Sequence, residues 1–144
     1  MTREELVEAF AGFPERFASA ARAAAGVPVS PGEWGPSEVG RHLVAVELVV
    51  WHVRLKEVAT QDDPQWSWTE PGPSAALEAA SLDTILAMFA QVRSQSVAAV
   101  RAFDDAGWAR SGTHATYGIL DVAGLLRLAI DHDDEHLRGV AVPG

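Results

Sequence analysis

The chain has 144 residues, a length typical of one domain, with 48% hydrophobic and 22% charged residues. This balance excludes intrinsic disorder, and the absence of cysteine excludes disulfides, thiolate metal ligands and a cysteine nucleophile. The net charge of −9, with Lys56 as the only lysine, argues against nucleic-acid binding, because a phosphate-binding face needs clustered basic residues.

The first predicted element is a helix from about Thr2 to Ala25. Thr2 and Glu5 have the spacing of a capping box, and apolar residues recur at three- and four-residue steps. These apolar residues are Leu6, Phe10, Phe13, Phe17 and Ala21. Pro14 lies inside the pattern, so a kink or a break is expected near Gly12.

A second helix is predicted from Pro36 or Ser37, which suit the first positions of a helix, to about Thr60. The residues expected on its buried face are Val39, His42, Val46, Val49 and Val53. The connector 61–81 follows, and its length is unusual for a loop in a compact domain. It is therefore either a crossover along the bundle or a functional lid, and Trp66 and Trp68 are expected to pin it to the body.

A third helix is predicted from about Leu82 to Asp105, and a fourth from about Ile119 to Val140. The expected core residues of the third are Leu82, Leu86, Phe89, Val92, Val100 and Phe103. Those of the fourth are Val122, Leu125, Ala129, His132 and His136, and Gly139, Pro143 and Gly144 are expected to end it. Neither segment shows the alternation that is typical of strands.

Four helices joined by connectors, two of them long, predict an all-α fold: one domain over residues 1–144, built as a four-helix bundle with crossover connections. The acidic start at Met1–Glu5 does not resemble a signal peptide. The longest apolar stretch, Leu43–Trp51, is interrupted by Glu47 and is too short to span a bilayer. A cytoplasmic protein without a membrane partner is expected.

Three of the five histidines fall on predicted core faces. His132 and His136 are four residues apart, so their side chains lie on one side of the last helix. One interpretation is that they are partly buried histidines or cations near a helix end. However, burying several imidazoles without partners is costly. If the second and fourth helices run antiparallel, His42 reaches the same level of the bundle as the other two.

Three neutral imidazoles that converge favour one divalent zinc, nickel, iron or copper ion, with a position left open for water or substrate. Two other metal sites fit less well. The segment His132–His136 has the spacing of a zinc-protease helix, but Asp133 stands where the glutamate base belongs. A di-iron centre would need two Glu-x-x-His motifs and two further glutamates.

Other residues are candidates for supporting roles. Glu38 and Asp133 are candidates to accept the outward N–H of a ligand histidine, or to act as a catalytic base. His114, in the connector before the last helix, and Trp66 and Trp68, in the long connector, are candidates to bind a substrate. His52 is expected to be peripheral, because it is rotated well off the face of His42.

Two longer motifs carry a family resemblance. They are Trp34-x-x-x-Glu38-Val39-x-x-His42-Leu43 at the second helix and His132-Asp133-x-x-His136-Leu137 in the fourth, with Tyr117-Gly118 before it. With these motifs the sequence resembles the DinB/YfiT-like family of metal-binding four-helix bundles, over nearly the whole chain. The resemblance implies that His42, His132 and His136 are the metal ligands.

The resemblance also implies an activity. Relatives include transferases and isomerases that use a low-molecular-weight thiol such as bacillithiol or mycothiol, with a metal that lowers the pKa of the thiol. The leading hypothesis is a metal-dependent thiol transferase that acts on a small electrophile in detoxification or stress response. The alternatives are a metal-dependent hydrolase and a non-enzymatic metal- or ligand-binding protein. The valine-rich surface of the second helix is a candidate homodimer interface.

Overall fold

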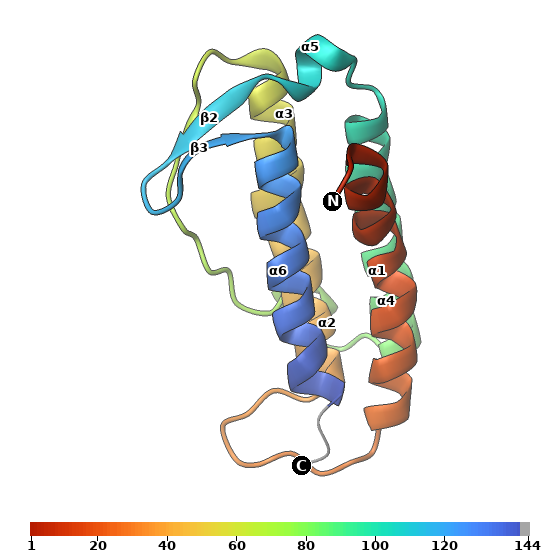
Figure 1. The fold of residues 1–144 in the computed structure, drawn as a ribbon. Coiled ribbons are helices and arrows are strands. Elements are labelled where there is room, and N and C mark those ends of the chain that lie inside the picture. Colours follow the sequence, from red (N-terminus) through yellow and green to blue (C-terminus); the bar gives the residue numbers. More distant parts are fainter. Residues whose placement is uncertain (142–144) are drawn as a thin grey trace.

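The computed structural model describes residues 1–141, and within them four long helices form a bundle (Figure 1). The first is α1 (Arg3–Ala24). The second is a continuous helix made of three parts: α2 (Pro36–Val46), the π-helical turn η1 (Glu47–Trp51) and α3 (His52–Thr60). The third and fourth are α4 (Leu82–Arg101) and α6 (Val122–Ala141). The prediction of an all-α four-helix bundle is confirmed. Pro143 and Gly144, expected to end the last helix, lie outside the described residues.

The direction of the helices explains the long connector. Figure 1 shows that α1 and α6 run one way along the bundle, whereas α2–α3 and α4 run the other way. Because α3 and α4 are parallel, the connector 61–81 must return along the whole bundle, and it includes the short 3-10 turn η2 (Ala75–Leu77). The predicted crossover is confirmed, and α2–α3 and α6 are antiparallel, as a shared level for the three histidines requires.

A kink or a break was predicted near Gly12; the break does not occur, because α1 continues through Pro14. Proline has no N–H, so the carbonyl oxygen of Phe10, four residues earlier, loses its helical donor. Arg93 on α4 supplies the missing hydrogen bond, since its Nη1 lies 2.8 Å from the Phe10 oxygen. A long-range side chain therefore stabilises the helix at the position where its own sequence interrupts it.

The predicted buried face of the second helix is correct only in its first half. Val49 and Val53 are 53% and 39% exposed, whereas Trp51 and Leu55 are buried. The π-helical turn η1 inserts one residue into the helical period, so the buried face moves by one position after Val46. The prediction of Val49 and Val53 as core residues was therefore wrong.

A small sheet was not predicted. It contains β1 (Gln65–Trp66), which is parallel to β2 (Ser111–His114), and β3 (Gly118–Asp121), which is antiparallel to β2. Strands this short carry too few residues for a visible alternation. Gly112 is required at its position, because a Cβ there would lie 2.5 Å from the ring of Trp66.

The sheet and a short helix also move two predicted boundaries. The third helix ends at Arg101 instead of Asp105, and the four-residue helix α5 (Asp105–Trp108) follows it. The fourth helix begins at Val122 instead of Ile119, because residues 118–121 pair with β2. Within the described residues, no helix is both long enough and apolar enough to cross a membrane.

The core consists of two apolar clusters with a buried arginine between them. One cluster contains Phe10, Trp51 and Leu125, and the other contains Phe13 and Phe89. The guanidinium carbon of Arg93 lies 4.0 Å from the ring centre of Phe10 and 5.2 Å from that of Phe89, so it touches both.

Candidate metal centre

The three histidines on the predicted core faces come together between α2 and α6. His42 is fully buried and His132 is 7% exposed. The ring centre of His42 lies 5.6 Å from that of His132 and 4.7 Å from that of His136. The Nε2 atoms of His132 and His136 are 3.2 Å apart. The side chains therefore point toward one another, as a shared cation requires.

The long connector adds a fourth group. Glu70 Oε1 lies 3.1 Å from Nε2 of His42, and one ligand atom from each of the four residues lies within 4.8 Å of the others. The next residue, Pro71, accepts a hydrogen bond from Nδ1 of His42 at 2.7 Å, because a carbonyl oxygen only accepts. This bond places the proton of a neutral His42 on Nδ1 and leaves the lone pair of Nε2 facing the cluster.

The surroundings keep the other two imidazoles neutral. Burial, together with the neighbouring His136, His42 and Arg93, lowers the pKa of His132 to about 3. Burial also lowers the pKa of His136, and His42 adds to that effect. Neutral imidazole is the form that binds a metal ion.

The donor set fits a divalent transition metal. Zinc takes nitrogen ligands at about 2.0–2.1 Å in a tetrahedron, which places neighbouring ligand atoms about 3.3 Å apart. The two short separations in the cluster, 3.1 and 3.2 Å, are close to this value. His42 Nε2 is buried and has no hydrogen-bond partner within the described residues, although Glu70 is near. A cation at this position would satisfy the facing lone pairs.

Three tryptophan rings surround the cluster. Trp34 lies 5.1 Å from His42 between ring centres, and Trp51 and Trp68 lie 5.9 and 5.7 Å from His132. Trp34 and Trp68 are each 40% exposed, so the apolar walls reach the surface. Trp68 was a predicted substrate-binding candidate, and the structure brings it to the histidines.

The other two substrate-binding candidates lie elsewhere. Trp66 and His114 are paired on neighbouring strands of the small sheet, and neither packs its ring on the three histidines in the described part of the chain. His114 is 1% exposed, and its Nδ1 accepts hydrogen bonds from the backbone N–H groups of Thr116 and Tyr117. Burial, together with Arg54, lowers the pKa of His114. Its contacts are those of a residue that holds the turn between β2 and β3.

The two candidate carboxylates have other partners. Glu38 accepts a hydrogen bond from the backbone N–H of Gly35 at the start of α2. Both oxygens of Asp133 accept hydrogen bonds from Arg93 at 2.9 Å. The carbonyl oxygen of Pro71, and not a carboxylate, accepts the outward N–H of His42. Nδ1 of His132 has no hydrogen-bond partner within the described residues.

A second buried polar group adjoins His132. It consists of Arg93, Glu47 and Asp133, and we call it the arginine cluster. Arg93 Nε also donates to Glu47 at 2.7 Å, and all three side chains are nearly inaccessible to solvent. Burial by itself lowers the pKa of Arg93. The attraction of Glu47 and Asp133 is stronger than this effect, so the pKa of Arg93 is raised. Burial raises the pKa of Asp133, against the opposite effect of Arg93. The cluster joins α1, α2–α3, α4 and α6 directly next to His132.

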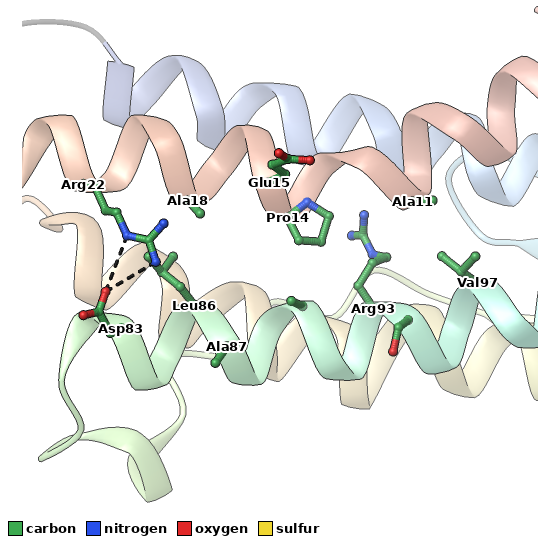
Figure 2. A pocket seen from close by; sticks show the side chains of 12 residues that line it. Ala11, Pro14, Glu15, Ala18, Arg22, Asp83, Leu86, Ala87, Arg93 and Val97 are labelled. Atoms are coloured by element: carbon green, nitrogen blue, oxygen red, sulfur yellow. Dashed lines mark hydrogen bonds and ion pairs between the residues drawn. The ribbon is translucent and has the colours of Figure 1, made fainter.

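A separate pocket of about 460 Å³ lies between α1 and α4 and holds none of the candidate ligands. Figure 2 shows Arg22 and Asp83 paired near one end and Pro14 beside Arg93 farther along. The guanidinium of Arg93 is already bound by carboxylates, so this pocket offers little reactive chemistry. The candidate metal centre and this pocket are therefore different places.

Sequence reasoning missed several residues of the site. Glu70 and Pro71 lie on the connector that was suspected of being a lid, and a carboxylate there was the available signal. Trp34 is part of the motif at the second helix, but the motif does not indicate that its ring lies against His42. Arg93 had no signal, because an arginine inside a helical pattern is usually a surface residue.

Comparison with known proteins agrees with this geometry. The model of the DinB superfamily matches residues 1–139. Among solved structures, one is described as "YfiT from Bacillus subtilis is a probable metal-dependent hydrolase with an unusual four-helix bundle topology". It superposes with a TM-score of 0.72 and 18% identity, covering 96% of this chain and 83% of that chain, which shows a shared fold. No curated protein matches the sequence significantly. The family match over almost the whole length shows that the chain belongs to the DinB superfamily.

Proposed function

We propose that this protein is a metal-dependent enzyme in which His42, His132 and His136 bind one divalent zinc, nickel or iron ion. The observation that carries the proposal is the convergence of lone pairs. Nδ1 of His42 donates to Pro71, and one ring nitrogen of each histidine lies within 4.8 Å of the others and of a Glu70 carboxylate oxygen. A divalent cation among these atoms would satisfy lone pairs that face one another in a largely buried site.

The reaction that we propose is transfer of a low-molecular-weight thiol, such as bacillithiol or mycothiol, to a small electrophile. A divalent metal bound by the histidines would lower the pKa of a thiol there and favour the thiolate. The chain has no cysteine, so the sulfur must come with the cofactor. Sulfur forms the new bond to the electrophilic carbon, the leaving group departs with the bonding pair, and the thiol proton passes to solvent. Trp34 and Trp68 form apolar walls for the electrophile.

A second candidate is metal-dependent hydrolysis, the activity that the description of YfiT suggests. Water is a weaker acid than a thiol and needs a base. Asp133 accepts hydrogen bonds from Arg93, and Glu38 accepts one from the backbone N–H of Gly35. Glu70 is therefore the remaining carboxylate near the histidine cluster. The Glu70 side chain is 49% exposed, so solvent reaches it.

The deciding experiment combines metal analysis with two substrate panels. Protein purified without an affinity tag is analysed for bound elements, next to a variant with alanine at all three histidines. We expect about one equivalent of divalent metal in the natural protein and none in the variant. We also expect turnover of small electrophiles that depends on an added thiol.

The other outcomes point to specific alternatives. Turnover of esters or amides without thiol, lost in Glu70→Gln, would favour the hydrolase. Metal binding with no turnover in either panel would favour a non-enzymatic metal- or ligand-binding protein. An equal metal content in natural protein and triple variant would overturn the site itself.

Three further proposals concern the context of the activity. We propose a cytoplasmic role in detoxification or stress response. We propose a homodimer that forms through the exposed residues Leu48, Val49 and Val53, which are 47%, 53% and 39% exposed. Light scattering of natural protein and of Val49→Lys tests the homodimer.

We also propose that residues 1–144 form one domain, which predicts a single cooperative unfolding transition.

A further inference from the structure

The connector between α3 and α4 passes directly over the histidine cluster, and it is fixed on both sides of that point. Before the cluster, Arg54 Nη2 donates to the carbonyl oxygen of Ser67 at 2.9 Å. After it, Ser74 exchanges two hydrogen bonds with Arg41, at 3.0 and 3.2 Å. We call the segment between these anchors, residues 68–73, the strap. It has no regular secondary structure.

The strap holds His42 through both ring nitrogens. Pro71 accepts from Nδ1 at 2.7 Å, and Glu70 Oε1 lies 3.1 Å from Nε2. A neutral imidazole with its proton on Nδ1 turns a lone pair toward the carboxylate, and two lone pairs at this distance repel each other. The position of the strap is therefore favourable only with positive charge between Glu70 and His42.

We propose that Glu70 is a fourth, exchangeable ligand of the metal ion whose other ligands are His42, His132 and His136. This inference rests on the proposed metal site and adds a residue to it. The histidines lie on packed helices and are largely buried, whereas the Glu70 side chain is 49% exposed on an irregular segment. In the proposed site, Glu70 therefore occupies the fourth coordination position when no substrate is bound. Of the four positions, this is the one that an incoming donor can take.

The charges indicate which donors can take it. Three neutral imidazoles and one carboxylate leave a divalent centre with one net positive charge. An anionic donor such as a thiolate replaces Glu70 without changing that charge, whereas a neutral donor leaves the buried site more positive, which is costly. The site is therefore selective for small anionic donors.

Release of Glu70 also moves an aromatic side chain. Trp68 is two residues before Glu70 in the strap, and its ring lies 5.7 Å from that of His132. When an incoming donor displaces Glu70, the strap loses its contact with the metal, and the environment of Trp68 changes. Tryptophan fluorescence therefore reports the exchange independently of turnover.

The test compares Co²⁺ binding by natural protein, Glu70→Gln and a matched control, Glu78→Gln, which changes an exposed glutamate of the same connector. Affinity is measured by calorimetry, and coordination by the visible absorption of Co²⁺. We expect Glu70→Gln to weaken Co²⁺ binding by about tenfold or more, because even outer-shell partners contribute that much. Glu78→Gln should bind as the natural protein does.

The second half of the test adds 2-mercaptoethanol to the Co²⁺-loaded proteins. Natural protein should gain a sulfur-to-cobalt absorption band together with a change in tryptophan fluorescence. Glu70→Gln should gain the band at a lower thiol concentration, because no carboxylate has to leave. Circular dichroism checks that the variants are folded.

The outcomes separate this inference from the proposed function. Unchanged Co²⁺ affinity and spectrum in Glu70→Gln, with binding lost in the triple histidine variant, would overturn the role of Glu70 and leave the metal site intact. Loss of ester hydrolysis in Glu70→Gln with unchanged Co²⁺ affinity would assign Glu70 as a base instead. Failure of the natural protein to bind Co²⁺ would overturn both proposals.

Discussion

The arginine cluster and the histidine cluster lie next to each other in the core, because Asp133 of the first and His132 of the second are neighbours on α6. The two clusters differ in whether their polar atoms find partners of opposite charge. In the arginine cluster, the Arg93 guanidinium meets Glu47, Asp133 and the carbonyl oxygen of Phe10. In the histidine cluster, one nitrogen from each of three imidazoles and a carboxylate oxygen of Glu70 lie within 4.8 Å of one another. The first group is held by its own charges and supports the fold. The second has the donor set of a cation site, and it is the part of the core that we propose for chemistry.

The largest effect is expected from Arg93→Met, which breaks the arginine cluster. The change leaves two buried carboxylates without a counter-charge and the Phe10 oxygen without a donor. We expect a loss of about 3–5 kcal/mol of unfolding free energy, the range for removing one partner of a buried ion pair. Urea unfolding measures it. Arg101→Met, at an exposed arginine of the same helix, is the control and should change stability by less than about 0.5 kcal/mol.

The histidine cluster should respond to metal instead of to loss of a charge. A divalent metal at a concentration about 100 times its Kd should stabilise the natural protein by about 2.7 kcal/mol, because it binds only the folded state. His132→Ala should lose this stabilisation, and His52→Ala, at a peripheral histidine, should retain it. Equal stabilisation of all three proteins would place the metal elsewhere.

Acid should weaken the metal-free protein through the same cluster. The folded state lowers the pKa values of His132 and His136, whereas the unfolded chain has the ordinary value near 6.5. Below pH 6.5 the unfolded state therefore binds more protons, and stability falls as the pH falls. Between pH 7.5 and 5.5 we expect a loss of about 1 kcal/mol for each histidine that stays neutral.

Thermal unfolding of the metal-free protein at the two pH values measures this loss. The double variant His132→Asn with His136→Asn is the matched comparison and should show a smaller difference between them. A pH dependence that is the same in both proteins would assign the effect to other groups.

The smallest expected effect concerns the link between Pro14 and Arg93. In Pro14→Ala the helix regains an N–H for the Phe10 oxygen, so that oxygen no longer depends on Arg93. The loss caused by Arg93→Met should therefore be smaller in the Pro14→Ala background, by about 1 kcal/mol, the usual net contribution of one hydrogen bond. A double-mutant cycle in urea measures this coupling, and additive losses would contradict it.

The sequence predicts the helices and the meeting of the three histidines well because both follow from periodicity. His132 and His136 lie on a regular helical face, and the spacing of His42 from the start of α2 sets its level in the bundle. Where the period changes, the prediction failed. The π-helical turn moved Val49 and Val53 out of the core, and nothing in their own residue types indicates such a turn.

Contacts that depend on packing between distant segments were not predictable from one sequence. Arg93 compensates for Pro14 across the bundle, and a break in α1 was the reasonable local expectation. Glu70 reaches the site only because α3 and α4 are parallel, so that the connector must pass along the bundle. Strand β1 needs a partner more than 40 residues away, because Gln65 pairs with Thr113.

The crossover has a consequence for how the protein is made. The residues that we propose as metal ligands are distributed over the chain: one near the start of α2, one on the strap and two near the end of α6. During synthesis the first of them emerges long before the last, so no partial chain offers the complete set. With the proposed ligands, metal uptake would be a late event that follows docking of the final helix, so a bound ion would mark a chain whose bundle is assembled.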